Sequence, residues 1–407
     1  MDELARRYLL LCLRLDRLVP GFIDSYNGPS ELAEAVGTEP PALPAELHDE
    51  AIELRAAAAE LLGDDDSTRP RGRWMDGQLR AIAALARRSG GEEIRYVDLL
   101  EQLFGMPIAA APEAELWEAR DRLSAALPGD GDLAARLEAH RDELRVAPDR
   151  VIDVLRASAA RFREISRRDF EIPPGEGIDW EEAHDEPWGA YATFVGSGRT
   201  RIIINLDLPL SVPGISYLAA HEAYPGHHAE HAVKERTLVE AGVAEATVRT
   251  MNTPESMLAE GQADVGREIV MTDRELEGEL ELIGRQAGIR ADWRRAMEVH
   301  RAGSELGPVA GNAALMLYRE GRPVDEVRAW VRGVSALHAP RIDHLFRTLA
   351  DPLYSTYPFT YTEGARLIRE WLQLTGQTVG FARLLSEQLS TGQLLAEIGA
   401  ASTTGTH

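Results

Sequence analysis

A proline-glycine pair at residues 225–226 interrupts an otherwise helical, histidine-rich segment, SYLAAHEAYPGHHAEHAV. Pro225 has no amide hydrogen, and its ring collides with the carbonyl of the residue four positions earlier, so a helix that enters this segment must kink or end there. Gly226 then permits backbone angles that other residues avoid. The sequence therefore predicts two helical pieces, with His221 on the first piece and with His227 and His228 on the second.

The first piece begins like the helix of an HExxH zinc peptidase, in which two histidines one turn apart bind the metal and the glutamate activates a water. The second histidine would fall at Pro225, so that spacing is absent. In an unbroken helix, His227 would lie about 240° around the axis from His221, and His228 would lie about 10.5 Å along it. A widened turn over residues 223–226 can instead bring His227 beside His221, with Glu222 as the candidate general base.

A third metal ligand is expected on the next helix, within NTPESMLAEGQADVG. Glu260 and Asp264 lie four residues apart on one face of it, so Glu260 can bind the metal while Asp264 accepts a hydrogen bond from a ligand histidine. Glu255 is the rival ligand, although its place near the helix start also suits compensation of the helix dipole. His231, His300, His338 and His344 are interpreted as structural.

Composition restricts the function classes. The net charge of −23 disfavours nucleic acid and anionic membranes as partners, because both bind clustered Lys and Arg. The single cysteine, Cys12, lies in an apolar helical pattern and is expected to be buried and inert. Charged residues interrupt the first apolar run too early for a signal peptide, and no run is long enough to span a membrane. We therefore expect a soluble, cytoplasmic protein.

Apolar residues recur at three- and four-residue spacing along most of the 407 residues, which predicts a mostly α fold. The exception is YATFVGSGRTRIIINLDL, where β-branched and aromatic residues flank a glycine turn and predict a β-hairpin beside the site. We expect an N-terminal helical region at 1–170 and a metal-binding catalytic region at 171–407, forming one compact unit or two lobes.

HEAYPGHH, followed by LAEGQAD and YTEGARLI, resembles the bacterial family called domain of unknown function 885, over residues of about 180–375. That family has an HExxPGHH signature, a later Glu-Gly pair and a Tyr-x-x-Gly element, and it is similar to gluzincin metallopeptidases. One departure is Gln262, where the family usually has tryptophan. The resemblance implies a gluzincin-like helical metallopeptidase fold, with Zn²⁺ held by His221, His227 and Glu260.

The same resemblance implies roles for further residues. Tyr361, in the Tyr-x-x-Gly element, would stabilise the oxyanion, although each of the three tyrosines in YSTYPFTY can also belong to the core. Independently of the resemblance, His228 is expected to hold a ligand or contact the substrate, or to cap the helix that Pro225 starts. Arg366 can pair with a substrate carboxylate or simply face water. Residues 200–208 of the hairpin can provide the sheet edge that gluzincins offer to an extended peptide, with Asn205 adding a side-chain hydrogen bond.

The expected activity is hydrolysis of a peptide or small amide by a metal-activated water. Two alternatives stay open at this point: a metal-dependent hydrolase of a non-peptide amide or ester, and a non-catalytic helical scaffold. Another divalent metal in place of zinc also stays open, as do the cleavage mode and the oligomeric state.

Overall fold

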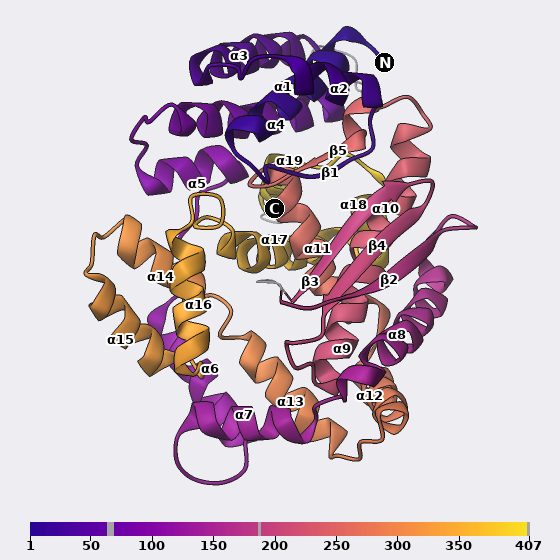
Figure 1. Cartoon of the computed structure of the whole chain (residues 1–407), viewed down its shortest axis with the longest axis vertical. Coiled ribbons are helices and arrows are strands. Elements are labelled where there is room, and N and C mark those ends of the chain that lie inside the picture. Colours follow the sequence, from indigo (N-terminus) through magenta and orange to yellow (C-terminus); the bar gives the residue numbers. More distant parts are fainter. Residues whose placement is uncertain (63–68, 186–188, 405–407) are drawn as a thin grey trace.

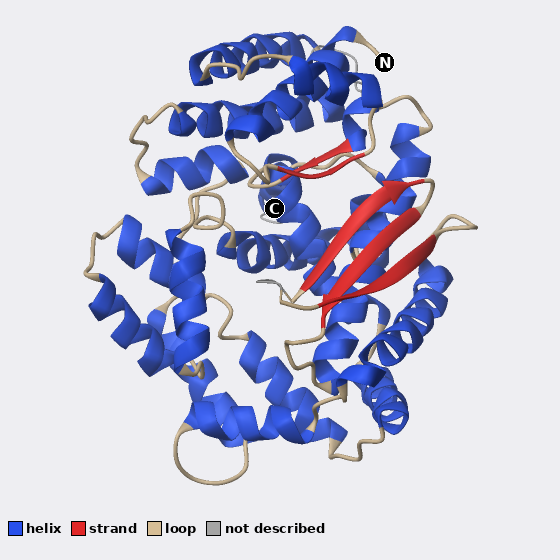
Figure 2. Cartoon of the chain, viewed as in Figure 1, coloured by secondary structure: helices blue, strands red, loops and turns tan. Residues whose placement is uncertain are grey.

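The structure, a computed structural model, describes residues 1–62, 69–185 and 189–404. The predicted mostly helical architecture with a small β-hairpin is confirmed (Figure 2). The first helices form one end of the molecule, and the small sheet lies near its middle beside α10 and α11 (Figure 1). Other helices, among them α6, α7 and α13, form the opposite end.

The helices of the first half are α1 (Glu3–Leu18), α2 (Ser30–Thr38), α3 (Pro44–Glu60), α4 (Arg69–Ser89), α5 (Tyr96–Phe104), α6 (Glu113–Ala126), α7 (Leu133–Glu143) and α8 (Pro148–Asp169). Those of the second half are α9 (Val212–Leu218), η1 (Ala219–Ala223), α10 (His227–Lys234), η2 (Glu235–Val239), η3 (Ala244–Thr247), α11 (Pro254–Val270), α12 (Asp273–Ala287), α13 (Trp293–Ser304), α14 (Val309–Tyr318), α15 (Val324–Val334), α16 (Ala339–Ala350), α17 (Pro358–Thr375), α18 (Gln377–Ser386) and α19 (Thr391–Thr404). Within the described residues, no helix is both long enough and apolar enough to cross a membrane.

The central sheet contains β2 (Gly177–Ala183), β3 (Ala190–Gly196) and β4 (Arg199–Asn205), in the order β2-β4-β3. β3 and β4 form the predicted antiparallel hairpin, and β2 adds to it in parallel. The expectation that residues 200–208 supply a free edge is wrong, because β4 is paired on both sides. Asn205 is buried, and its side-chain oxygen accepts a hydrogen bond from the Asp207 amide. The side chain is therefore not presented to a substrate.

A second, smaller sheet pairs β1 (Ile23–Tyr26) with β5 (Val248–Thr250). β1 has four residues and β5 has three, so both are too short to show a periodic pattern in the sequence. Their pairing joins the expected N-terminal and C-terminal regions, and a hydrogen bond from Tyr96 to the Ser355 carbonyl joins them again. The division at residue 170 therefore stays a prediction, with close contacts crossing it.

Two glycines set the closest approach between α11 and α17, the helices that carry Glu260 and Tyr361. A Cβ atom at Gly261 would lie 2.3 Å from the carbonyl carbon of Gly364, and one at Gly364 would lie 2.2 Å from the Met257 carbonyl oxygen. No side chain larger than hydrogen fits at this crossing. The glycines of the Glu-Gly and Tyr-x-x-Gly elements thus bring two site helices together.

This crossing predicts that Gly261→Ala lowers the free energy of unfolding by about 1–3 kcal/mol, because the new methyl group overlaps the α17 backbone. The matched control is Gly278→Ala in α12, where an added Cβ would meet no heavy atom within 4 Å. That control should be unchanged or up to about 1 kcal/mol more stable, since alanine favours helix. Urea unfolding of both variants measures the difference, and an equal effect in the two would contradict the steric explanation.

Candidate metal centre

A cleft of about 810 Å³ lies beside α10, α11, α17 and the two sheets. The candidate residues Glu222 and Tyr361 line it, as do the three proposed ligands. Among the described residues, one group of His, Cys, Asp or Glu side chains lies close enough to hold a metal ion, and it consists of His221, His227 and Glu260. The cleft therefore contains a candidate centre that is built from three separate stretches of backbone.

A widened turn is present, but it lies at residues 219–223 and not at the expected 223–226. α9 passes into η1, a π-helical turn, in which the Tyr224 amide bonds to the Ala219 carbonyl at 3.2 Å. The chain then breaks at Pro225 and restarts as α10. Gly226 passes so close to the preceding turn that a Cβ atom there would lie 1.8 Å from the His221 carbonyl oxygen. This close return is what places His227 next to His221.

α11 supplies the third residue. Thr253 caps its first turn, with reciprocal side-chain bonds to Ser256, and Pro254 occupies the first helical position. Seven residues on from the cap, Glu260 points toward the two histidines, and its buried Oε2 has no hydrogen-bond partner of ordinary geometry within the described residues. An unsatisfied buried carboxylate oxygen is costly unless a cation occupies the space beside it.

The three candidate ligand atoms have separations that suit a shared zinc ion. The Nε2 atoms of His221 and His227 lie 3.2 Å apart, and Glu260 Oε2 lies 3.4 Å from the first and 3.7 Å from the second. Tetrahedral coordination at zinc–ligand distances of about 2.0–2.2 Å needs ligand atoms about 3.3–3.6 Å apart. The residues present thus fit a zinc ion with one coordination position left open.

Asp264 fixes the orientation of His221. Its Oδ1 lies 3.1 Å from His221 Nδ1 and accepts a second hydrogen bond from the Tyr217 hydroxyl at 2.5 Å. A proton on Nδ1 leaves Nε2 free to face the other ligands, which is how an outer carboxylate orients a ligand histidine. The relation expected between Asp264 and a ligand histidine is therefore present.

Two tyrosines line the cleft beside Glu260: Tyr361 lies on α17, and Tyr357 lies in the turn before that helix. The Tyr357 hydroxyl donates to Glu260 Oε1 at 2.6 Å, which leaves Oε2 as the free oxygen of that carboxylate. The Tyr361 ring lies 6.2 Å from the His221 ring and 5.4 Å from the Tyr357 ring, measured between centroids. Burial raises the pKa of Tyr361 well above its usual value, so its hydroxyl keeps its proton and can donate.

The electrostatics of the centre favour a cation. Burial alone lowers the pKa of both histidines, but the carboxylates of Asp264 and Glu260 raise the pKa of His221 well above its usual value, and Glu260 raises that of His227. Burial acts to raise the pKa of Glu260. The two histidines have the larger, opposite effect, so the pKa of this carboxyl is lowered. Positive charge is therefore stabilised at this position, whether as protons or as a metal ion.

The structure does not bring every candidate residue to the centre. His228 is fully buried, with Nε2 bonded to Glu176 and Nδ1 to Thr200, so neither nitrogen is available to a ligand ion or a substrate. Glu255, the rival ligand, instead pairs with Arg249 at 2.8 Å.

The remaining residues weighed from sequence are not part of the three-residue group, although His231 and His344 line the cleft. His231 stacks on the Phe194 ring, and Arg366 pairs with Glu363 and Glu370 on its own helix. His344 is not among the three grouped side chains, and His338 lies 3.8 Å from Glu138.

Sequence reasoning missed three residues of the site. Tyr217 and Tyr357 each lie four residues before a candidate residue, so the helical i, i+4 relation indicates a shared face and could have identified them. Asp24 lines the cleft from β1, and burial raises its pKa to about 6. Nothing in the sequence links that residue to the site, because a distant short strand delivers it.

The ligand geometry predicts that the purified protein carries about one equivalent of zinc and that Glu260→Ala loses it, because two histidines alone leave the ion weakly held. Elemental mass spectrometry measures this. The control is Glu255→Gln, which alters the rival carboxylate and should retain the metal. Zinc retained by Glu260→Ala and lost by Glu255→Gln would reverse the assignment of the third ligand.

No family model matches the chain, and no curated protein matches its sequence. Among solved structures, a candidate lipoprotein from Colwellia psychrerythraea has a TM-score of 0.52 at 12% identity, covering 89% of this chain and 70% of that one. An M32 carboxypeptidase from Deinococcus radiodurans has a TM-score of 0.43 at 14% identity, covering 98% and 94%. A candidate lipoprotein of unknown function from Shewanella oneidensis has a TM-score of 0.38 at 12% sequence identity. The match covers 91% of this chain and 76% of that one. The first similarity shows a shared overall fold, and the two lower scores carry no functional conclusion.

Proposed function

We propose that the protein is a zinc-dependent hydrolase of peptides. The observation that carries the proposal is the convergence of His221, His227 and Glu260, at separations that suit one zinc ion, in a cleft that Glu222 also lines. The resemblance of HEAYPGHH to the domain of unknown function 885 family, and through it to gluzincins, supports the same function. The metal identity and the family stay part of the proposal.

Each residue of the centre has a role in this proposal. Bound zinc would supply Lewis acidity, which lowers the pKa of a water and polarises the scissile carbonyl. Glu222 takes a proton from the attacking water and then delivers it to the leaving amine. The Tyr361 hydroxyl donates to the oxyanion that develops on the carbonyl oxygen. Asp264 and Tyr357 hold the side chains of His221 and Glu260 in place through their hydrogen bonds.

The edge of the central sheet supports a peptide as the substrate. The Gly189 carbonyl bonds to β4, whereas the Phe194 carbonyl accepts a hydrogen bond from outside the sheet. Because successive residues of a strand direct their main-chain groups to opposite sides, Ala190 and Ala192 direct theirs away from β4. Both residues line the cleft. An extended peptide can therefore add to β3 as a further strand beside the proposed ligands.

The proposed role of Glu222 predicts that Glu222→Gln lowers kcat by about a hundredfold to ten-thousandfold, because the amide cannot accept the proton. Its zinc content should stay that of the wild-type protein, since Glu222 is not among the ligands. A quenched fluorescent peptide library measures turnover, and elemental analysis of the same preparation provides the control. A variant with full peptidase activity and full zinc content would overturn this mechanism.

Strand addition predicts an alternating response to backbone methylation of a cleaved peptide. Each substrate in a matched set carries one N-methyl amide outside the scissile bond. Methylation at amides that bond to Ala190 or Ala192 should lower kcat/KM by about fivefold or more, because one hydrogen bond is worth about 1 kcal/mol. Methylation at the intervening amides should have little effect. Uniform sensitivity would contradict docking on β3, and turnover of esters or small amides alone would favour the non-peptide alternative.

A further inference from the structure

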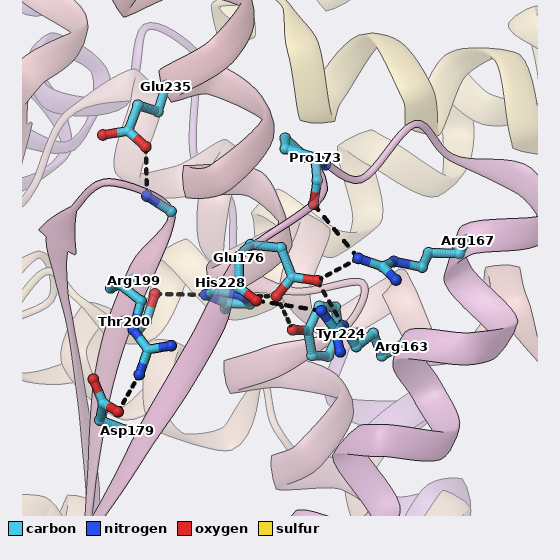
Figure 3. Close-up of polar contacts among 11 residues, drawn as sticks. Arg163, Arg167, Pro173, Glu176, Asp179, Arg199, Thr200, Tyr224, His228 and Glu235 are labelled. Carbon is cyan, nitrogen blue, oxygen red and sulfur yellow. Dashed lines mark hydrogen bonds and ion pairs between the residues drawn. The ribbon is translucent and has the colours of Figure 1, made fainter.

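A second buried cluster contacts the histidine-rich segment and is organised around Glu176, the residue immediately before β2 (Figure 3). The Glu176 side chain has no exposed surface. Its Oε2 accepts hydrogen bonds from the Tyr224 hydroxyl and from His228 Nε2, the latter at 2.9 Å. Its Oε1 accepts from Arg163 Nε at 2.6 Å and from Arg167 at 3.1 Å. All the accepting capacity of this carboxylate is therefore used by side chains.

The two donors on Oε2 enclose the break in the histidine-rich segment. Tyr224 immediately precedes Pro225, and His228 immediately follows the candidate ligand His227. The His228 ring is also held on its other side, because Thr200 of β4 lies 2.7 Å from Nδ1. One carboxylate thus binds both ends of the short stretch that turns His227 toward His221.

The support behind Glu176 is rigid. Arg163 and Arg167 are one turn apart on α8, a long helix, and both side chains reach the carboxylate in Figure 3. Arg163 also donates to the Glu176 main-chain carbonyl at 3.2 Å, which fixes the backbone as well as the side chain. Paired, fully hydrogen-bonded charges in a buried position favour one arrangement of the groups that they join, because any displacement leaves a buried charge unsatisfied.

We propose that Glu176 is a positioning residue that sets the separation of His221 and His227 and thereby the metal affinity of the centre. It touches neither the proposed ligands nor the cleft, and it acts through Tyr224 and His228. The inference rests on the proposed function only in requiring that the centre binds a metal. Loss of the Glu176 contacts lets α10 shift relative to η1, which widens the gap between the two imidazole nitrogens.

The test is the affinity of the full chain for zinc, measured by competition with a chromogenic chelator, in wild type and in Glu176→Gln. The substitution keeps the shape but places an amide NH₂ against either the arginines or the Tyr224 and His228 donors. We expect zinc affinity to fall by about tenfold to a hundredfold, as when outer partners of metal ligands are removed. We also expect weaker visible absorption of the cobalt(II)-loaded variant, because a distorted site loses tetrahedral geometry.

Glu279→Gln is the matched control. Glu279 is also fully buried and also bound to α8, through Ser158 at 2.6 Å and Arg161 at 3.0 Å, but both of these partners lie on α8 and neither belongs to the histidine-rich segment. This variant should lower the melting temperature while its zinc affinity and cobalt spectrum stay as in wild type. If both variants lose affinity in proportion to lost stability, Glu176 has no specific effect on the centre and the proposal is wrong.

Tyr224→Phe provides a second variant that keeps every charge and removes one of the two donors. We expect about threefold weaker zinc binding, with the same direction of change in the cobalt spectrum. Wild-type zinc affinity in a folded Glu176→Gln variant, or in Tyr224→Phe where Glu176→Gln does not fold, would overturn the positioning role. Absence of zinc binding by the wild-type protein would instead overturn the proposed function, and the inference with it.

Discussion

The carbonyl of His221 and the α-carbon of Gly226 come so close that the chain admits no side chain at residue 226. The meeting of the two candidate histidine ligands follows from this contact. It requires the preceding helix to widen into η1, and it directs α10 away from the axis of α9. As a result, two histidines six residues apart meet at 3.2 Å, although they would face different directions on a regular helix.

Two buried ionic groups hold α10 from opposite sides. Glu176 binds the start of the helix, as described above. Farther along, Glu230 of α10 pairs with Arg249 at 2.7 Å, and the same guanidinium pairs with Glu255 of α11. Gln78 of α4 contacts Glu255 as well, at 3.3 Å. Arg249 therefore links the helix that carries His227 to the helix that carries Glu260, and the N-terminal region contributes to that link.

Local sequence rules account for much of this arrangement. Apolar spacing predicted the helices, the glycine turn predicted the β3–β4 hairpin, and the Pro225-Gly226 pair indicated a break that can reunite two histidines. What the sequence could not provide was partner choice across long distances. Glu176 lies 52 residues from His228, and Asp24 reaches the cleft through a four-residue strand. The edge of the sheet was misassigned for the same reason, because β2 pairs with β4 through a contact that no local pattern indicates.

The charges around the two histidines provide a further argument for a cation at this position. Glu260 and Asp264 lie within 3.4 Å of His221, and Glu222 and Asp24 line the same cleft. Two neutral imidazoles cannot balance that many carboxylates. Although burial lowers the pKa of both histidines, the nearby carboxylates raise it above the usual value. A divalent ion bound there would satisfy the free oxygen of Glu260, accept both Nε2 lone pairs and offset the surrounding negative charge. A proton binds to one nitrogen or oxygen atom, whereas a single metal ion can bind the Glu260 oxygen and both Nε2 atoms. This difference favours a metal centre over a buried ion-pair network.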